Sequence, residues 1–149
     1  MASVYKRVLK FKNRYPGTVA WRLRQNSEII ERHLNPDERV KYVFTGQENE
    51  SNFSIFETGI VALTNKRLLI GRKRLFFGYF LNSITPDMFN DLKVTSGLLW
   101  GKVYIDTVKE FVTISNISKS ALPEIETEIT SFMMEEKKKY YKGENEEDD

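Results

Sequence analysis

The sequence predicts a mainly β domain with a C-terminal α-helix, preceded by an N-terminal helical arm. Apolar residues recur at helical spacing up to residue 34, alternate or form short runs between residues 40 and 115, and return to helical spacing from Leu122. Turn-forming residues divide the central part into seven short segments with strand character. Seven short strands at close spacing are typical of an antiparallel sandwich or barrel.

The clearest strand pair lies at residues 59–71. Its arms are the apolar runs 61–63 and 68–70, with the turn-forming residues Thr64 and Asn65 between them. Apolar runs without alternation indicate strands that meet little water on either face. The seven strand candidates are residues 40–45, 54–64, 66–72, 77–84, 92–99, 102–106 and 110–115.

An amphipathic helix is expected after the last strand. Its apolar stripe consists of Leu122, Ile125, Ile129, Phe132 and Met133. Gly143 should end this helix, and the acidic residues that follow should be disordered. The expected organisation is therefore a basic helical arm at 1–34, a β domain at 35–142 and an acidic tail at 143–149.

The arm is expected to form two helices separated by Pro16 and Gly17. On a helical wheel the first helix has an apolar arc made of Val4, Val8, Phe11 and Tyr15, and a basic side made of Lys6, Arg7, Lys10 and Arg14. In the second helix Trp21 falls off the apolar stripe. Because so short a helix is marginal alone in water, its apolar arc needs a surface on this domain, on a partner or on a bilayer.

Charge is unevenly distributed, although the net charge of the 149 residues is only +2. Residues 1–34 hold eight Lys or Arg and two Glu, whereas residues 143–149 hold five acids and no base. Charged ends of opposite sign favour electrostatic contacts with a partner. The alternative is that these charges serve only to keep the protein soluble.

Several functional classes are disfavoured by what the sequence lacks. It has no cysteine, which excludes thiol catalysis, iron–sulfur clusters and cysteine-based zinc sites and fits a cytoplasmic location. A lone histidine, His33, gives neither a metal site nor an acid–base pair, so no cofactor or metal is expected. No nucleotide-binding or nucleophile-elbow motif occurs, and we expect no enzyme. Neither a signal peptide nor a membrane anchor is expected, because no apolar run approaches about 20 residues.

Four segments carry a resemblance to a known family. Leu34-Asn-Pro-Asp-Glu38 resembles the L-x-P-x-E lead-in of bacterial pleckstrin-homology-like (PH-like) domains of the YokE type, and residues 62–69 resemble their T-(D/N)-K-R-L hairpin. Ile84 resembles the apolar residue that opens their central strand pair, and residues 101–105 resemble their G-x-(I/V)-x-I strand. Over residues 34–141 the resemblance implies a PH-like barrel of seven strands capped by one helix. It also implies a binding module, often one that self-associates.

Phosphoinositide binding is not expected. Eukaryotic PH domains that hold these lipids place Lys or Arg in the loop between the first two strands. The corresponding residues here, 46–52, contain Glu48 and Glu50 and no base, and would repel a phosphate.

The expected function is therefore a non-enzymatic binding or assembly module that acts in protein–protein interaction or self-association. The candidate partner or membrane face is Val4, Val8, Phe11, Tyr15 and Trp21. The candidate anion or lipid contacts are Lys6, Arg7, Lys10, Arg14, Arg72, Lys73 and Arg74, the last three of which are equally compatible with a solvated turn. Alternatives are a peripheral membrane adaptor, or a nucleic-acid-associated protein, using the same arm.

Overall fold

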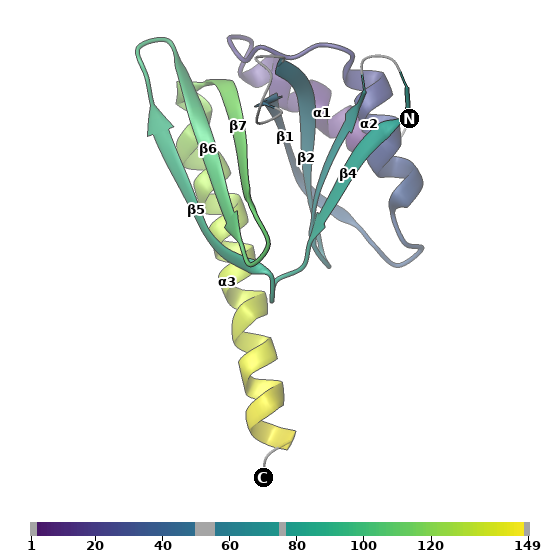
Figure 1. Cartoon of the computed structure of the whole chain (residues 1–149), viewed down its shortest axis with the longest axis vertical. Helices are drawn as coiled ribbons and strands as arrows, with labels where there is room; N and C mark the ends of the chain where they lie inside the picture. Colours follow the sequence, from purple (N-terminus) through teal and green to yellow (C-terminus); the bar gives the residue numbers. More distant parts are fainter. Residues whose placement is uncertain (1–2, 50–55, 75–76, 148–149) are drawn as a thin grey trace.

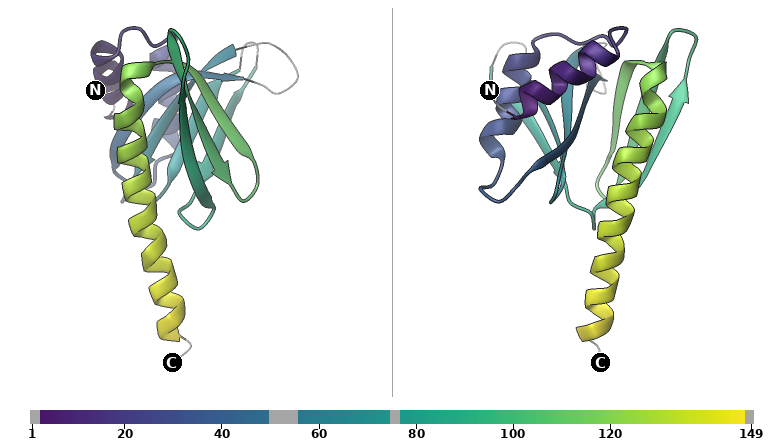
Figure 2. Two further views of the ribbon diagram at one scale, coloured as in Figure 1. Left: turned by 90° about the vertical axis from the view of Figure 1, so that its left-hand side faces the viewer. Right: turned by 180° about the vertical axis from the view of Figure 1, so that it is seen from behind.

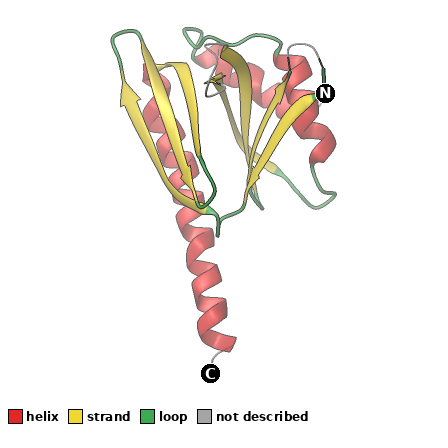
Figure 3. Cartoon of the chain, in the orientation of Figure 1, coloured by secondary structure: helices red, strands yellow, loops and turns green. Residues whose placement is uncertain are grey.

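Seven strands form one antiparallel sheet in the computed structural model, which describes residues 3–49, 56–74 and 77–147. The strands are β1 (Val40–Asn49), β2 (Phe56–Thr64), β3 (Leu68–Lys73), β4 (Tyr79–Ile84), β5 (Phe89–Ser96), β6 (Trp100–Thr107) and β7 (Phe111–Ser118). Their order in the sheet is β4-β3-β2-β1-β7-β6-β5. The sheet bends between β1 and β7, so that β1–β4 and β5–β7 form two halves set at an angle (Figure 1). The predicted mainly β fold with a C-terminal helix is confirmed (Figure 3).

The long helix α3 (Leu122–Glu147) follows a short 3-10 turn (Lys119–Ala121) and packs along β5 and β6. Ile125, Ile129 and Met133 of its predicted stripe are fully buried, whereas Phe132 is only partly buried. Together with inward-facing residues of both halves of the sheet they form the inner core. The helix then continues beyond the body of the protein (Figure 2).

The predicted end of α3 at Gly143 is wrong, since the helix runs on to Glu147. A single glycine costs a helix only about 1 kcal/mol relative to alanine, and that does not by itself end it. Among the helices of the described residues, none is long and apolar enough to cross a membrane.

Two N-terminal helices, α1 (Ser3–Arg14) and α2 (Leu23–His33), cover the outer face of the β1–β4 half (Figure 2). A second apolar cluster lies between these helices and the sheet, and consists of Val4, Val8, Ile30, Val40, Val43, Ile60, Ala62 and Leu69. The predicted apolar runs are therefore confirmed as strands buried on both faces: the inner core covers one side and the two helices cover the other.

The start of α2 differs from the sequence prediction. The expected separation at Pro16 and Gly17 places its start directly after Gly17, but the helix begins at Leu23. Arg22, just before it, has a left-handed backbone conformation with φ of 52°. The preceding residues instead bond to β7: Val19 N donates to Asn116 O at 2.9 Å, and Ser118 N donates to Thr18 Oγ1 at 2.9 Å. These bonds attach the connection between the two helices to the sheet.

The loop between the first two strands, expected at residues 46–52, begins later in the structure. Residues 46–49 belong to β1, and residues 50–55 lie outside the described residues. Gly46 lies within β1 and marks a close approach between strands. A Cβ at this position would lie 2.6 Å from Ile114 Cγ2 and 2.8 Å from the backbone oxygen of Ser115.

Candidate functional site

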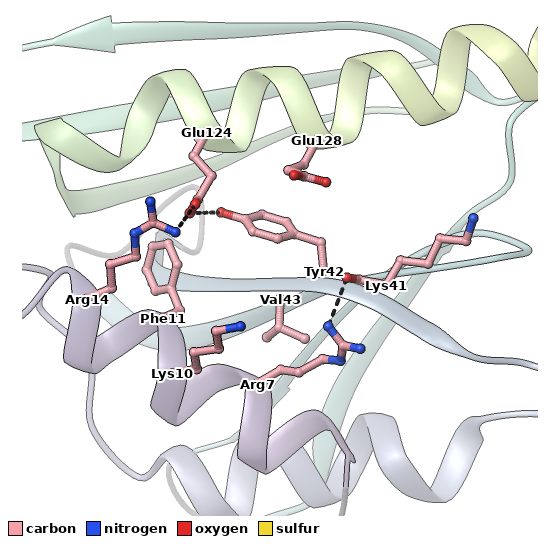
Figure 4. A pocket seen from close by; sticks show the side chains of 9 residues that line it. All are labelled: Arg7, Lys10, Phe11, Arg14, Lys41, Tyr42, Val43, Glu124 and Glu128. Carbon is pink, nitrogen blue, oxygen red and sulfur yellow. Dashed lines mark hydrogen bonds and ion pairs between the residues drawn. The ribbon is translucent and has the colours of Figure 1, made fainter.

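A cavity of about 240 Å³ opens between α1, β1 and the first turns of α3 (Figure 4). Helix α1 contributes four of its lining residues, β1 three and α3 two. They are Arg7, Lys10, Phe11, Arg14, Lys41, Tyr42, Val43, Glu124 and Glu128. The cavity therefore lies where the N-terminal helix meets the strand and the helix of the inner core.

Glu124 joins the three elements at one end of the cavity. Arg14 Nη1 lies 2.7 Å from Glu124 Oε1, and the Tyr42 hydroxyl donates to Glu124 Oε2 at 3.0 Å. Burial raises the pKa of Tyr42 well above its usual range, and the Glu124 carboxylate raises it further. Tyr42 consequently remains a neutral donor, and both oxygens of Glu124 have a partner.

The two helices give the cavity walls of opposite charge. Arg7 and Lys10 stand on the α1 side, whereas Glu124 and Glu128 stand on the α3 side (Figure 4). Arg7 Nη1 donates to Lys41 O at 3.0 Å, and Lys41 Nζ lies 4.7 Å from the centroid of the Phe132 ring. The lining holds four cations and two carboxylates, a net charge of +2.

The apolar arc of α1 is not a free surface. Val4, Val8, Phe11 and Tyr15 are at most 9 % exposed, packed against the sheet of their own chain. The expectation that they face a partner or a membrane is therefore wrong for these four residues. The physical reason is that the outer face of the β1–β4 half is itself apolar and needs a cover. Trp21, the fifth residue of that expected face, is 52 % exposed.

The basic side of α1 does face outward. Lys6, Arg7, Lys10 and Arg14 are all exposed. The fold brings Arg7, Lys10 and Arg14 together around the cavity and leaves Lys6 outside its lining. Lys41, which sequence analysis did not select, joins them because β1 runs beside α1.

Arg72 was expected to contact an anion, and the structure contradicts this. Its side chain is 3 % exposed on the inner face of β3, with Nε 3.2 Å from Glu48 Oε2. It also pairs with Glu57, and its guanidinium lies 4.9 Å from the centroid of the Phe80 ring. Strand alternation turns Arg72 inward while its neighbour Lys73 is exposed, as is Arg74.

Sequence analysis missed an exposed apolar surface at the β5–β6 hairpin. Leu98, Leu99 and Trp100 are 88 %, 65 % and 41 % exposed, and we call them the apolar tip. The signal in the sequence was the run of three apolar residues that follows the turn-forming Ser96 and Gly97.

Three hydrogen bonds fix the apolar tip. Gly97 N donates to Trp100 O at 2.8 Å, Trp100 Nε1 donates to Gly17 O at 3.0 Å, and Lys119 Nζ donates to Leu98 O at 3.0 Å. The tip is therefore held both to the connection between α1 and α2 and to the turn before α3.

His33 links the end of α2 to β4. Its Nδ1 lies 2.6 Å from Ile29 O and its Nε2 lies 3.1 Å from the Tyr79 hydroxyl. Within the part of the chain that the structure describes, no group of three or more His, Cys, Asp or Glu could hold a metal ion.

A family model described as "Bacterial PH domain" matches residues 34–131, which include all seven strands and the first turns of α3. No curated protein matches the chain. Helices α1 and α2 precede the matched residues, so the cavity combines residues inside the match with residues outside it.

Proposed function

Because the chain belongs to the bacterial PH domain family, we propose that it is a non-enzymatic module that binds another protein, a second copy of itself being the simplest partner. PH-like domains are generally binding modules. The observation that carries the proposal is the apolar tip. It presents Leu98, Leu99 and Trp100 to solvent on a hairpin held by three hydrogen bonds.

The chemistry of the apolar tip supports a protein partner. Residues 96–100 carry no charge, so the complementary patch on the partner would be apolar. Tryptophan is enriched among the residues that dominate binding energy at protein interfaces, and a fixed hairpin loses little conformational entropy on binding. Nucleic acid, in contrast, is bound mainly through phosphate contacts to Lys and Arg.

Burial of the α1 arc weakens the two alternatives expected from sequence. An amphipathic helix enters a bilayer through its apolar face, and here that face packs on the sheet. Single-stranded nucleic acid stacks on exposed aromatic rings, and Phe11 and Tyr15 are buried, whereas Trp21 stays exposed. The basic outer side of α1 is still available to contact an anionic surface.

The test compares two matched double variants by light scattering over a range of protein concentrations. The test variant, Leu98→Ser with Leu99→Ser, removes apolar surface at the apolar tip. The control variant, Val108→Ser with Phe111→Ser, removes exposed apolar surface at the hairpin between β6 and β7. We expect the wild-type mass to rise above the 17.5 kDa of one chain, and the tip variant to weaken this association by tenfold or more. The control should associate like the wild type.

A second experiment detects a partner other than a second copy of the chain. A photo-crosslinking residue replaces Leu98 in the protein expressed in cells, and the control carries the same residue in place of Phe111. A discrete crosslinked protein that forms from position 98 alone supports the proposal. Wild-type protein that stays monomeric and forms no crosslink specific to position 98 contradicts it. If the protein forms no protein contact but sediments with anionic vesicles, the membrane alternative is supported.

A further inference from the structure

We propose that the cavity between α1, β1 and α3 binds a small phosphorylated amine, with the phosphate at Lys10 and Arg7 and the ammonium at Glu128. The site is separate from the apolar tip and does not depend on its function. The inference rests on the opposite charges of the two walls, on the side chains that remain without partners, and on the size of the cavity (Figure 4).

The α1 wall supplies the phosphate contacts. Among the described residues, Lys10 Nζ takes part in no hydrogen bond or ion pair, although it lines the cavity. Arg7 uses Nη1 to bond Lys41 O and has further N–H donors in its planar fork. An ammonium and a guanidinium on successive turns of one helix can hold a phosphate through charge-assisted hydrogen bonds.

The α3 wall argues against a simple anion site. Glu124 is satisfied by Arg14 and Tyr42, but the Glu128 carboxylate has neither a hydrogen bond nor an ion pair within the described part of the chain. A bare phosphate would be repelled by this charge across the cavity, although solvent around the exposed Glu128 weakens the repulsion. An ammonium group on the same ligand removes the conflict, because it can donate to Glu128 while the phosphate faces α1.

Net charge favours a phosphate over a carboxylate as the anionic group. The lining carries a net charge of +2. A phosphomonoester carries about −1.5 to −2 near neutral pH, so with one ammonium the ligand carries about −0.5 to −1. An amino acid would be neutral overall and would leave the excess positive charge of the cavity uncompensated.

The volume of the cavity suits a short ligand. A cleft of about 240 Å³ that is partly open to solvent accommodates an aminoethyl phosphate. The buried side chains of Phe11 and Val43 provide an apolar floor for the carbon chain between the two charges. Free phosphoethanolamine is such a phosphomonoester. The headgroup of phosphatidylethanolamine holds the same phosphate and ammonium groups, but as a phosphodiester it is neutral overall, so the net charge of the lining favours the free compound.

The test titrates the full chain with O-phosphoethanolamine by calorimetry, with inorganic phosphate and ethanolamine as single-charge controls. We expect saturable binding at least tenfold tighter than for either control, a gain of about 1.4 kcal/mol or more. Lys10→Gln and Glu128→Gln should each weaken binding about tenfold. The matched controls Lys6→Gln and Glu126→Gln, on the same two helices but outside the cavity lining, should leave it unchanged. All four residues are exposed, so the variants should fold.

Two arms distinguish the sources of the ligand. The first arm mixes the protein with phosphatidylcholine vesicles with or without phosphatidylethanolamine. If the protein sediments only with the vesicles that contain phosphatidylethanolamine, the ligand is the lipid headgroup. If the protein binds soluble phosphoethanolamine and does not sediment, the ligand is the free compound. The proposal is overturned if phosphate alone binds as well as phosphoethanolamine and Glu128→Gln strengthens that binding. Absence of saturable binding in both arms overturns it too, as does equal binding by the cavity and control variants.

Discussion

The Glu38 carboxylate and the Arg67 guanidinium form a two-pronged ion pair, with Nε–Oε2 and Nη2–Oε1 distances of 3.0 Å each. Glu38 is fully buried as a side chain, and its Oε2 also accepts a 2.6 Å hydrogen bond from Thr64 Oγ1. Arg67 Nη2 donates in addition to His33 O at 3.0 Å. The pair thus attaches the end of α2 and the start of β1 to the β2–β3 turn, and it explains why the lead-in motif and the hairpin motif occur together.

We predict that Arg67→Ala will destabilise the fold by about 3–5 kcal/mol, because it leaves the buried Glu38 carboxylate without its counter-charge. The matched control is Lys66→Ala, which removes the neighbouring ion pair between Lys66 Nζ and Asp37 Oδ2 at 2.7 Å. Both of those side chains are exposed and solvent screens their charges, so this change should cost far less than Arg67→Ala. Urea unfolding of the two variants measures the difference, and equal losses would contradict the clamping role of Arg67.

The same pair should make stability depend on acid pH. Burial by itself raises the pKa of Glu38, but hydrogen bonds from Arg67 and Thr64 outweigh it and hold the pKa below its ordinary value of 4.5. A carboxylate with a lowered pKa in the folded state stabilises the fold at all pH values above the ordinary one. This contribution is lost as the pH falls through the folded-state pKa.

We therefore predict that Glu38→Gln will lower the unfolding free energy near neutral pH and reduce the loss of stability below about pH 4.5. The control is Asp37→Asn. The Asp37 pKa is also lowered, by its hydrogen bond to Lys66, but the group is exposed and solvent screens it. Asp37→Asn should leave the wild-type acid profile nearly unchanged. A Glu38→Gln profile as steep as that of the wild type would show that other carboxylates control acid unfolding.

Val8 provides a test of how α1 is used. Because Val8 is fully buried between α1 and the sheet, Val8→Asp would place an uncompensated carboxylate there and should cost about 3–5 kcal/mol. Asn13→Asp introduces the same group on an exposed position of the same helix and should cost little. Thermal denaturation followed by circular dichroism compares them. If Val8→Asp melts at the wild-type temperature, α1 is not part of the folded core.

The sequence already held the information that α1 packs on its own sheet, but the inference needs one further step. The apolar runs 61–63 and 68–70 predicted strands buried on both faces, and residues 122–133 offered a helix for only one face. Another apolar surface had to cover the second face, and the arc of Val4 and Val8 was available. Periodicity within one segment indicates that a face is buried, but not which surface buries it.

The candidate site could be predicted only in part, for a related reason. The helical wheel placed Arg7, Lys10 and Arg14 on one outward side of α1, which holds in the structure. Lys41 and Glu128 belong to segments distant in sequence, and only the tertiary packing of α1 against β1 and α3 brings them to the same cavity. Arg72 shows the opposite failure. A dense basic run was interpreted as exposed, but strand alternation turned its first residue inward, toward Glu48 and Glu57.

Gly46 tests how the two halves of the sheet are joined. Strands β1 and β7 pair through residues 47–48 and 114–115, next to this glycine. A methyl group in Gly46→Ala would lie 2.8 Å from the backbone oxygen of Ser115, which cannot move without disturbing that pairing. We predict a loss of about 1–3 kcal/mol, typical of overpacking, and a fall in melting temperature of roughly 2–4 °C per kcal/mol.

The control is Gly17→Ala, since a Cβ there would lie 3.8 Å from its nearest neighbour and should be tolerated. Equal melting temperatures for the two variants would mean that β7 can shift away from β1 at little cost, and that the joint between the halves is looser than the close approach at Gly46 implies.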